Sequence, residues 1–565
     1  MLPSRFSEKT YWEGGFWKTL TTSDAWDRNA EACPDRVALS DSKRRLTWAG
    51  AKIWIDRLAV GLIERDYSKS DVLMVQLPNR VELALIRVAC ERAGCLCLPV
   101  NPAFRKKELA YAARFVGAKG IMVPYASGNF NYYDSAVSLV EEIECLEDIF
   151  IVGEPVPGGA VSVDRMIQDD LEKKYPADCL ERTRCRPMEF SVISMTTGTT
   201  GFPKFLERSI CSHMDMSGEF AKTWKVTDKD VIALFSPSSG GPNIAGYFVA
   251  PLMKSRVVML ERFRSEDALR LIEKERITVI PVVPTMLVKL IDDPHFREFD
   301  LSSLRLIISI GAALPLKLAR DVEERMGAPV VQRYGSVDSG LSATHSPDDP
   351  REVRHLTVGK PVGEAEVKLV DDTGNPVAQG EVGEVVIRVK REFTGYFKDI
   401  KTTLQSWTGE GWYHVGDLGK WDGRGNLMIV GRKKEMIIRG GQNIYPSEIE
   451  DLLLGHEKIK EVAIIGIPDD IMGERACACV VPGTPDDFIA LEDMVAFLKG
   501  KEVSAYKIPE RIEFLDALPM VGRQKIDKKT LKHQIYKKLK KVRVSDDERG
   551  KIEGPAGDHR LSQGA

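Results

Sequence analysis

A loop rich in threonine and glycine is the part of this chain best suited to bind phosphate. Residues 194–204 read SMTTGTTGFPK and follow the apolar run 190–193, which predicts a strand. Glycine lets the backbone turn so that several N–H groups face one point, and such a nest binds anions. Threonine hydroxyls add hydrogen bonds, and a lysine adds a positive charge. The loop therefore predicts a triphosphate site, and an ordinary polar turn is the alternative.

The loop differs from the Walker phosphate loop. Lys204 follows Pro203 where that pattern has a glycine, and Phe205 stands where it has Ser or Thr. The chain also lacks a G-x-G-x-x-G run after a strand, which argues against an NAD-dependent oxidoreductase.

Three further segments carry groups that suit nucleotide chemistry. Residues 332–340 (QRYGSVDSG) follow an apolar strand and offer an aromatic plane, a flexible glycine and a carboxylate. Residues 412–419 (WYHVGDLG) fix an acid beside a glycine turn. Residues 431–450 (GRKKEMIIRGGQNIYPSEIE) combine several basic residues with paired glycines.

The elements around these segments alternate between strands and helices from about residue 20 to 430. Such alternation predicts sheets covered by helices, an α/β fold. Val/Ile runs on either side of the turn 371–376 predict hairpins between 362 and 389, and hence a β-rich subdomain at about 355–431. Strands are expected at 72–77, 95–100, 254–260, 279–283 and 304–310, and a helix at 80–93.

At 565 residues the chain is too long for one core. We expect a large N-terminal domain over 1–431, a small α+β C-terminal domain over 432–541, and a disordered tail over 542–565. The Lys-rich run 528–541 is interpreted as the solvated face of a helix rather than a site for an acidic partner, because its apolar residues have helical spacing. In the C-terminal domain, strands are expected at 462–467 and 476–481, and helices at 447–454 and 491–499.

The charge is nearly balanced, with 80 Lys and Arg against 83 Asp and Glu. This gives no electrostatic case for nucleic acid or an anionic membrane as partner. No apolar run is long enough to span a bilayer, and residues 1–5 lack a signal-peptide hydrophobic region. The CxC pairs 95–97 and 477–479 alternate within apolar runs, so they predict core strands rather than zinc ligands. We expect all ten cysteines to be reduced thiols, as in the cytoplasm.

The four motifs together resemble those of the acyl-adenylate-forming superfamily, which includes acyl-CoA synthetases, aryl-acid ligases, luciferases and peptide-synthetase adenylation domains. The resemblance covers about residues 10–535, with the motifs in the family's order. The segment 348–354 (DDPREVR) is similar to the branch that activates aryl acids. The resemblance implies that ATP activates a carboxylic acid as acyl-AMP with release of pyrophosphate. A thiol then displaces AMP, so ATP, Mg²⁺ and CoA are the expected ligands.

The resemblance also implies how ATP is held. The loop threonines and Lys204 would bind the β- and γ-phosphates, and Tyr334 would stack on adenine beside residues 311–313. Asp417 would accept hydrogen bonds from both ribose hydroxyls, with Arg432 close by. The expected nucleotide-binding residues are Thr196, Thr197, Gly198, Thr199, Thr200, Gly201, Gly311, Ala312, Ala313, Tyr334, Gly335, Ser336, Val337, Asp417 and Arg432.

Lys525 matches the family's C-terminal lysine, which bridges the acyl and phosphate oxygens during adenylation, and a plain surface lysine is the alternative. Lys204 and Lys525 are therefore the expected catalytic residues. The family rotates its C-terminal domain between the two steps, so the resemblance implies that the domain over 432–541 is mobile, and Lys434 matches the hinge. After rotation, Gly440 and Gly441 would line the CoA channel, where missing side chains let pantetheine pass close to the backbone.

Several positions depart from the family pattern. Asp338 matches the Mg²⁺ ligand, but it is one methylene shorter than the usual Glu. Val337 replaces a hydroxyl residue, so an α-phosphate hydrogen bond is missing or comes from Ser336. Gln524 replaces a glycine, and Phe205 replaces a small residue. None of these changes removes a charged group.

The acid pocket is expected to be lined by 236–247, the segment near 310–311, and 335–340. The run 238–243 (SSGGPN) carries small groups and no charge. It favours an uncharged aromatic or alicyclic acid, or a medium-chain acid, over a dicarboxylate, which needs a buried Arg or Lys. His213 is either a pocket residue or a helix-surface histidine. The expected pocket residues are Ser238, Ser239, Gly240, Asn243 and Gly340.

The leading interpretation is a cytoplasmic AMP-forming acid–CoA ligase, with a homodimer as one option. An aryl-acid AMP ligase that loads the phosphopantetheine arm of a carrier protein shares every motif, and the acceptor distinguishes the two. A catalytically silent nucleotide-binding protein is favoured by Val337 and Asp338. The retained charged residues, among them Lys204, Asp417 and Lys525, oppose that third interpretation.

Overall fold

The chain forms two compact units, Met1–Ile429 and Val430–Ala565. The expected tail at 542–565 lies outside the part of the chain that the structure describes. The computed structural model describes residues 20–176, 178–195, 203–237, 241–335, 340, 342–363, 365–389, 394–408, 410–440, 442–469, 471–484, 487–521 and 525–539.

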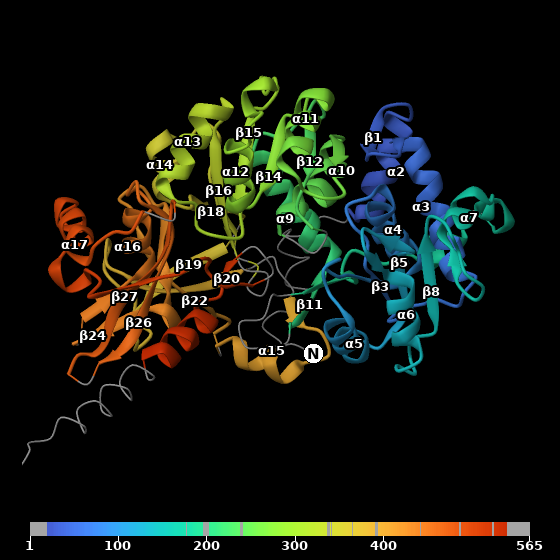
Figure 1. Ribbon diagram of the computed structural model, residues 1–565. Helices are drawn as coiled ribbons and strands as arrows, with labels where there is room; N and C mark the ends of the chain where they lie inside the picture. The colour runs from blue at the N-terminus through green and yellow to red at the C-terminus, as the bar shows by residue number, and fades with distance from the viewer. Residues whose placement is uncertain are drawn as a thin grey trace, which may run out of the picture. The chain divides into compact units, whose positions relative to one another are not determined.

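A nine-stranded sheet dominates one half of the first unit, in the order β18-β17-β16-β15-β14-β12-β13-β1-β2 (Figure 1). Its six central strands are parallel, and antiparallel strands flank them. The run LIISI of β15 is fully buried, as expected for a parallel strand covered on both faces. The strands are β1 (Val37–Ser40), β2 (Arg45–Thr47), β12 (Val231–Leu234), β13 (Arg256–Met259), β14 (Val279–Val282), β15 (Leu306–Ile310), β16 (Val330–Gly335), β17 (Ser342–Thr344) and β18 (Lys360–Pro361).

An eight-stranded sheet forms the other half of the first unit, in the order β21-β11-β10-β4-β3-β5-β8-β9. Strands β10, β4, β3, β5, β8 and β9 are parallel, and β11 and β21 pair antiparallel at one edge. The strands are β3 (Val72–Val75), β4 (Leu96–Pro99), β5 (Ala118–Pro124), β8 (Asp148–Val152), β9 (Val161–Ser162), β10 (Phe190–Met195), β11 (Phe205–Ser209) and β21 (Thr394–Tyr396), with a small hairpin of β6 (Ala126–Ser127) and β7 (Phe130–Asn131) beside them.

Helices cover these sheets, so the expected α/β class is confirmed (Figure 1). Helix α4 is buried at every position, because one core joins its side chains to both sheets, including Leu73 of β3 and Leu234 of β12. The helices are α2 (Thr22–Ala32), α3 (Trp48–Ile63), α4 (Val81–Ala93), α5 (Lys106–Val116), α6 (Tyr132–Val140), α7 (Val163–Gln168), α8 (Cys179–Thr183), α9 (Ile210–Thr223), α10 (Ala250–Met253), α11 (Ser265–Glu275), α12 (Pro284–Ile291), α13 (Leu316–Met326), α14 (Arg351–Leu356) and α15 (Ile400–Ser406).

A four-stranded antiparallel sheet in the order β19-β20-β22-β23 follows α14. It comprises β19 (Ala365–Val370), β20 (Gly383–Val389), β22 (Tyr413–Trp421) and β23 (Leu427–Arg432). The pairing of β19 with β20 is the hairpin expected between residues 362 and 389. A small core that includes Leu369, Ile387 and Leu427 holds this sheet together.

The second unit is a five-stranded sheet with helices on it. Leu531 and Ile535 of the Lys-rich helix 528–539 are buried against the sheet, so the helical spacing of its apolar residues is confirmed. The elements are β24 (Ile437–Arg439), β25 (Gln442–Ile444), α16 (Pro446–Leu453), β26 (Ile459–Asp469), β27 (Gly473–Pro482), α17 (Leu491–Gly500) and β28 (Arg511–Phe514), with a hairpin of β29 (Met520–Val521) and β30 (Lys525–Ile526).

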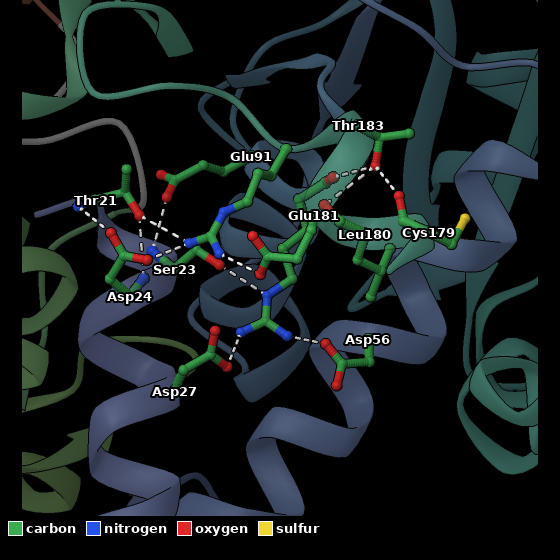
Figure 2. A network of polar contacts seen from close by, with 12 residues as sticks. Thr21, Ser23, Asp24, Asp27, Asp56, Glu91, Cys179, Leu180, Glu181 and Thr183 are labelled. Atoms are coloured by element: carbon green, nitrogen blue, oxygen red, sulfur yellow. Dashed lines mark hydrogen bonds and ion pairs between the residues drawn. The ribbon is translucent and has the colours of Figure 1, made fainter. Parts of the chain in front are cut away.

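A buried polar network ties α2, α3 and α4 together (Figure 2). Arg92 is only 4% exposed, and its guanidinium forms ion pairs with Asp27 and Asp56. Its Nε donates to Ser23 Oγ at 2.8 Å. The neighbouring Glu91 accepts a hydrogen bond from Ser23 N at 2.7 Å. A buried cation held in this way is costly to remove, because its acidic partners would then keep only Lys52, which lies 3.8 Å from Asp27 and 2.7 Å from Asp56.

We expect Arg92→Met to lower the free energy of unfolding by about 3 kcal/mol, because the carboxylates of Asp27 and Asp56 would lose their buried cation and keep only the half-exposed Lys52. The matched control is Arg182→Met, since Arg182 pairs with Asp178 at an exposed site where both side chains are 65% accessible. That change should stay within about 0.5 kcal/mol. Denaturant unfolding of both variants checks the prediction, and similar losses for the two would contradict it.

Candidate functional site

Parallel strands of the nine-stranded sheet end together at one edge. β14, β15 and β16 are neighbours, and Ile310 pairs in register with Arg333. The chain turns at Gly311, whose φ of +94° strongly favours glycine. Residues 311–313 are exposed there, beside Tyr334 on the next strand. Ligands of open α/β sheets bind beyond the carboxyl ends of the strands, so this edge is where a nucleotide is expected.

Tyr334 and Asp417 are brought together by the fold, as a shared nucleotide site requires. The Tyr334 hydroxyl donates to Asp417 Oδ2 at 2.5 Å, although 83 residues separate the two in sequence. Asp417 belongs to β22 and is only 4% exposed, whereas the Tyr334 ring is half-buried against the core of the four-stranded sheet. A hydroxyl that donates to a carboxylate makes a strong, charge-assisted bond. The pair therefore places an aromatic plane beside a fixed acid.

Lys204 lies next to the side chain of Tyr396. Its Nζ is 4.5 Å from the centre of the ring and 3.4 Å from the hydroxyl. The following residue, Phe205, is buried and stacks on Phe115 with ring centroids 5.0 Å apart. The departure from a small residue is therefore explained by packing, because Phe205 anchors the start of β11 in the core. Lys204 itself is exposed.

Many of the expected site residues lie outside the described part of the chain, so their roles stay predictions. These are Thr196, Thr197, Gly198, Thr199, Thr200, Gly201, Ser238, Ser239, Gly240, Ser336, Val337, Asp338 and Gly441.

Asn243 supports the backbone of the expected acid pocket. It ends the 3₁₀ turn η3 (Gly241–Asn243) and is buried. Its Nδ2 donates to Pro237 O at 2.6 Å and to Ser236 O at 3.2 Å. The amide therefore closes the loop that follows β12. Gly340 is buried and has a φ of +70°.

The interpretation of His213 as a helix-surface residue is wrong. Both ring nitrogens are buried and have no hydrogen-bond partner among the described residues. The ring stacks on Phe248, with centroids 4.6 Å apart and planes 3° from parallel. Burial lowers the pKa of His213 well below its ordinary value, and the charges of Arg208 and Arg87 lower it further. His213 is thus a neutral imidazole packed inside the first unit.

The second unit holds the expected hinge and channel residues. Arg432 ends β23, and Lys434 lies in the 3₁₀ turn η6 (Lys433–Glu435). Gly440 has a φ of +55°, and a Cβ there would lie 2.8 Å from Cε of Met472. A side chain at this position would therefore strain the backbone and crowd its neighbour. The backbone of Lys525 begins β30, where it pairs with Val521.

Lys528 is a structural anchor that the sequence motifs did not single out. Its Nζ lies 2.7 Å from a carboxylate oxygen of Glu450 in α16 and 3.3 Å from one of Glu435 in η6. Desolvation opposes the charge of Lys528, but the two carboxylates outweigh it and raise its pKa. The anchor thus joins the segment after Lys525 to the turn that contains Lys434. The local sequence around Lys528 does not predict these ion pairs, because Glu435 and Glu450 lie far from it along the chain.

The cysteines pack as expected. All ten are unpaired, and Cys95, Cys97, Cys477 and Cys479 are buried. Within the described ranges, no group of three or more His, Cys, Asp or Glu side chains is placed to hold a metal ion. No helix in those ranges is long and apolar enough to cross a bilayer.

The chain resembles proteins of known activity over nearly its whole length. It is 30% identical to the medium-chain fatty-acid–CoA ligase of Escherichia coli (strain K12), covering 94% of this chain and 93% of that protein. It is 28% identical to the 2,3-dihydroxybenzoate-AMP ligase of Bacillus subtilis (strain 168), with 95% and 97% covered. The O-succinylbenzoate CoA synthetase of Bacillus subtilis, solved with ATP and magnesium ion, superposes with a TM-score of 0.75 at 25% identity, covering 89% of this chain and 98% of that one.

Two family patterns also match the chain. The pattern described as AMP-binding enzyme matches residues 26–397. The pattern described as AMP-binding enzyme C-terminal domain matches residues 448–525. The predicted resemblance and the predicted class of ligase are confirmed at this level. The chain belongs to the AMP-binding enzyme family.

Proposed function

We propose that this protein is an AMP-forming acid–CoA ligase that acts on an uncharged aromatic, alicyclic or medium-chain carboxylic acid. The Tyr334–Asp417 hydrogen bond carries the proposal, because it joins the aromatic plane expected at adenine to the acid expected at ribose. The relatives named above support the reaction and the range of acids. The location that suits these substrates is the cytoplasm, where unpaired cysteines stay reduced.

In the first step a carboxylate oxygen of the acid bonds to the α-phosphorus of ATP, and the bond to pyrophosphate breaks. Both reactants are anions, so positive charge at the transferring group lowers the barrier. Lys204 and Lys525 are the residues proposed to supply it. Lys204 is exposed beside the Tyr396 ring. Asp417 and Tyr334 orient the nucleoside, so their contribution is positioning.

In the second step the sulfur of CoA bonds to the acyl carbon, the thiol proton is lost, and AMP leaves with the electron pair of the broken C–O bond. Lys525 takes no part in this second step. A rotation about Lys434 would remove Lys525 and bring the strand around Gly440 to the thiol's path. The open backbone at Gly440 suits close passage of a pantetheine arm.

Magnesium is proposed to bind through Asp338, which lies outside the described residues. A carboxylate is the hard oxygen ligand that Mg²⁺ prefers, and the ion supplies charge neutralisation at the phosphates when bound.

A carrier-loading aryl-acid AMP ligase is the second candidate. The observation that favours it is the similarity to the 2,3-dihydroxybenzoate-AMP ligase over 95% of this chain. The two candidates share the first step and differ in the thiol acceptor.

Tyr334→Phe is expected to raise the KM for ATP about fivefold, because the variant loses one charge-assisted hydrogen bond that positions the Asp417 carboxylate. ATP–pyrophosphate exchange measures the effect. Tyr132→Phe is the matched control, since Tyr132 donates to Pro102 O at 3.1 Å elsewhere in the first unit. An unchanged KM for ATP in Tyr334→Phe would contradict the proposal that Tyr334 and Asp417 bind the nucleotide.

Lys525→Ala is expected to slow acyl-AMP formation by about 100-fold or more, because the reacting oxygens lose a cation. Thiolysis of supplied acyl-AMP should be spared. Lys529→Ala changes an exposed lysine four residues away and should leave both rates intact. Equal loss of both half-reactions in Lys525→Ala would count against a lysine that serves only one step.

Pyrophosphate release across a panel of acids tests the substrate class. Benzoate, cyclohexanecarboxylate and octanoate should be turned over with CoA, whereas succinate should not, because a second carboxylate needs a buried cation in the pocket. Stronger turnover of succinate than of benzoate would refute the class. A single burst of pyrophosphate that CoA does not extend would favour the carrier-loading ligase.

A further inference from the structure

The backbone on both sides of Lys525 is held in place. Val521 pairs with Lys525 in the β29–β30 hairpin. Two residues after Lys525, Asp527 N donates to Pro519 O at 2.7 Å. The Asp527 carboxylate accepts from Thr530 N at 3.0 Å and from Thr530 Oγ1 at 2.7 Å, which caps the start of the Lys-rich helix. The place of Lys525 in the second unit therefore depends on how the start of this helix is anchored.

Lys528 anchors the start of the helix with two ion pairs. Its Nζ lies 2.7 Å from a carboxylate oxygen of Glu450 and 3.3 Å from one of Glu435, and only 17% of its side chain is accessible. Both carboxylates raise the pKa of Lys528 against the effect of burial, so it keeps its charge at neutral pH. Ion pairs on an open surface contribute little, whereas loss of one partner of a largely buried pair leaves an unbalanced charge.

Glu450 ties this anchor to the core of the second unit. It lies in α16, and the carboxylate oxygen that meets Lys528 also accepts a hydrogen bond from Ile464 N at 2.6 Å. Ile464 belongs to β26 and is fully buried. The position of Glu450 is therefore set by the sheet, and Lys528 is set by Glu450.

Glu435 ties the same anchor to the proposed hinge. It follows Lys434 directly in η6. One cation, Lys528, thereby joins three parts of the second unit, namely the hinge turn, α16 and the segment that carries Lys525. Parts that are joined in this way move together when the unit turns as a rigid body.

We propose that Lys528 is a positioning residue of the ligase, whose ion pairs set where Lys525 stands during the adenylation step. Lys528 acts through Lys525 and not on the reacting atoms. The inference rests on the proposed function and adds a residue to it. A small misplacement of a reacting group lowers a rate steeply, so loss of the anchor should slow acyl-AMP formation. Thiolysis should be spared, because Lys525 takes no part in it.

Lys528→Met is the first test, because it keeps an unbranched side chain and removes the charge. Single-turnover formation of acyl-AMP should slow about tenfold, while thiolysis of supplied acyl-AMP stays unchanged. Lys532→Met is the matched control, since Lys532 lies on the same helix and pairs with Glu474 of β27 at 2.9 Å. This control should keep both rates.

Two outcomes of this test would overturn the inference. One is unchanged acyl-AMP formation in Lys528→Met, and the other is equal loss of both half-reactions, which indicates general damage to the unit. A wild-type protein that forms no acyl-AMP with any acid of the panel would instead contradict the proposed function.

Glu435→Gln is the second test, and it does not depend on whether Lys528→Met folds. Glu435 is 34% accessible, and the amide keeps its shape while removing its charge. Acyl-AMP formation should slow about threefold, again with thiolysis spared. The double variant with Lys528→Met should be no slower than Lys528→Met alone, because both changes remove the same contact. Losses that multiply in the double variant would contradict the anchor.

Lys528→Arg keeps the positive charge and should recover part of the rate of acyl-AMP formation. A merely apolar packing role for the lysine stem predicts the opposite order, with the methionine variant faster than the arginine variant. An arginine variant that is as slow as Lys528→Met would overturn the inference.

Discussion

The hydrogen bond between Tyr334 and Asp417 is the contact on which the proposed nucleotide site depends. It connects the end of β16 in the nine-stranded sheet to β22 in the four-stranded sheet. A buried carboxylate must have a donor, and a phenol is a donor that also carries a flat apolar face. One contact therefore sets the spacing between a stacking surface and an acid. Strand β16 is paired on both sides, with Arg333 facing Ile310 and Tyr334 facing Ala343, whereas the β20–β22 ladder is irregular between Leu418 and His414, where Asp417 lies.

Much of this arrangement is readable from the sequence. Runs such as LIISI at 306–310 lie between helical patterns, and these local periodicities predict parallel strands under helices. Tyr334 and Asp417 could be singled out because each stands beside glycines in a segment that resembles a known family. The order of the motifs identifies that family, and the match over residues 26–397 bears this out.

The sequence could not show which buried charges pair. Arg92 and Arg87 lie on the same helix, yet one meets two carboxylates and the other meets two aromatic rings. The sequence pattern of α4 does not distinguish the two positions, so only the packing of α2, α3 and the π-helical turn η4 (Ala245–Val249) against α4 decides which partners each arginine meets. His213 shows the same limit, since a histidine on an amphipathic helix gives no local sign that an aromatic ring covers it. Such contacts are decided by segments far apart in the chain.

The ion pairs of Lys528 have a consequence for how the second unit works. They link the residues after Lys525 to Glu435 and Glu450, while the β29–β30 hairpin holds the preceding backbone. A strand held at both ends cannot reach a distant target by local backbone motion. In the proposed rotation Lys525 moves with the entire second unit, so drag from the solvent, rather than torsion within one loop, would limit how quickly Lys525 reaches the reacting oxygens. The proposed rotation would therefore slow as the viscosity of the solvent rises.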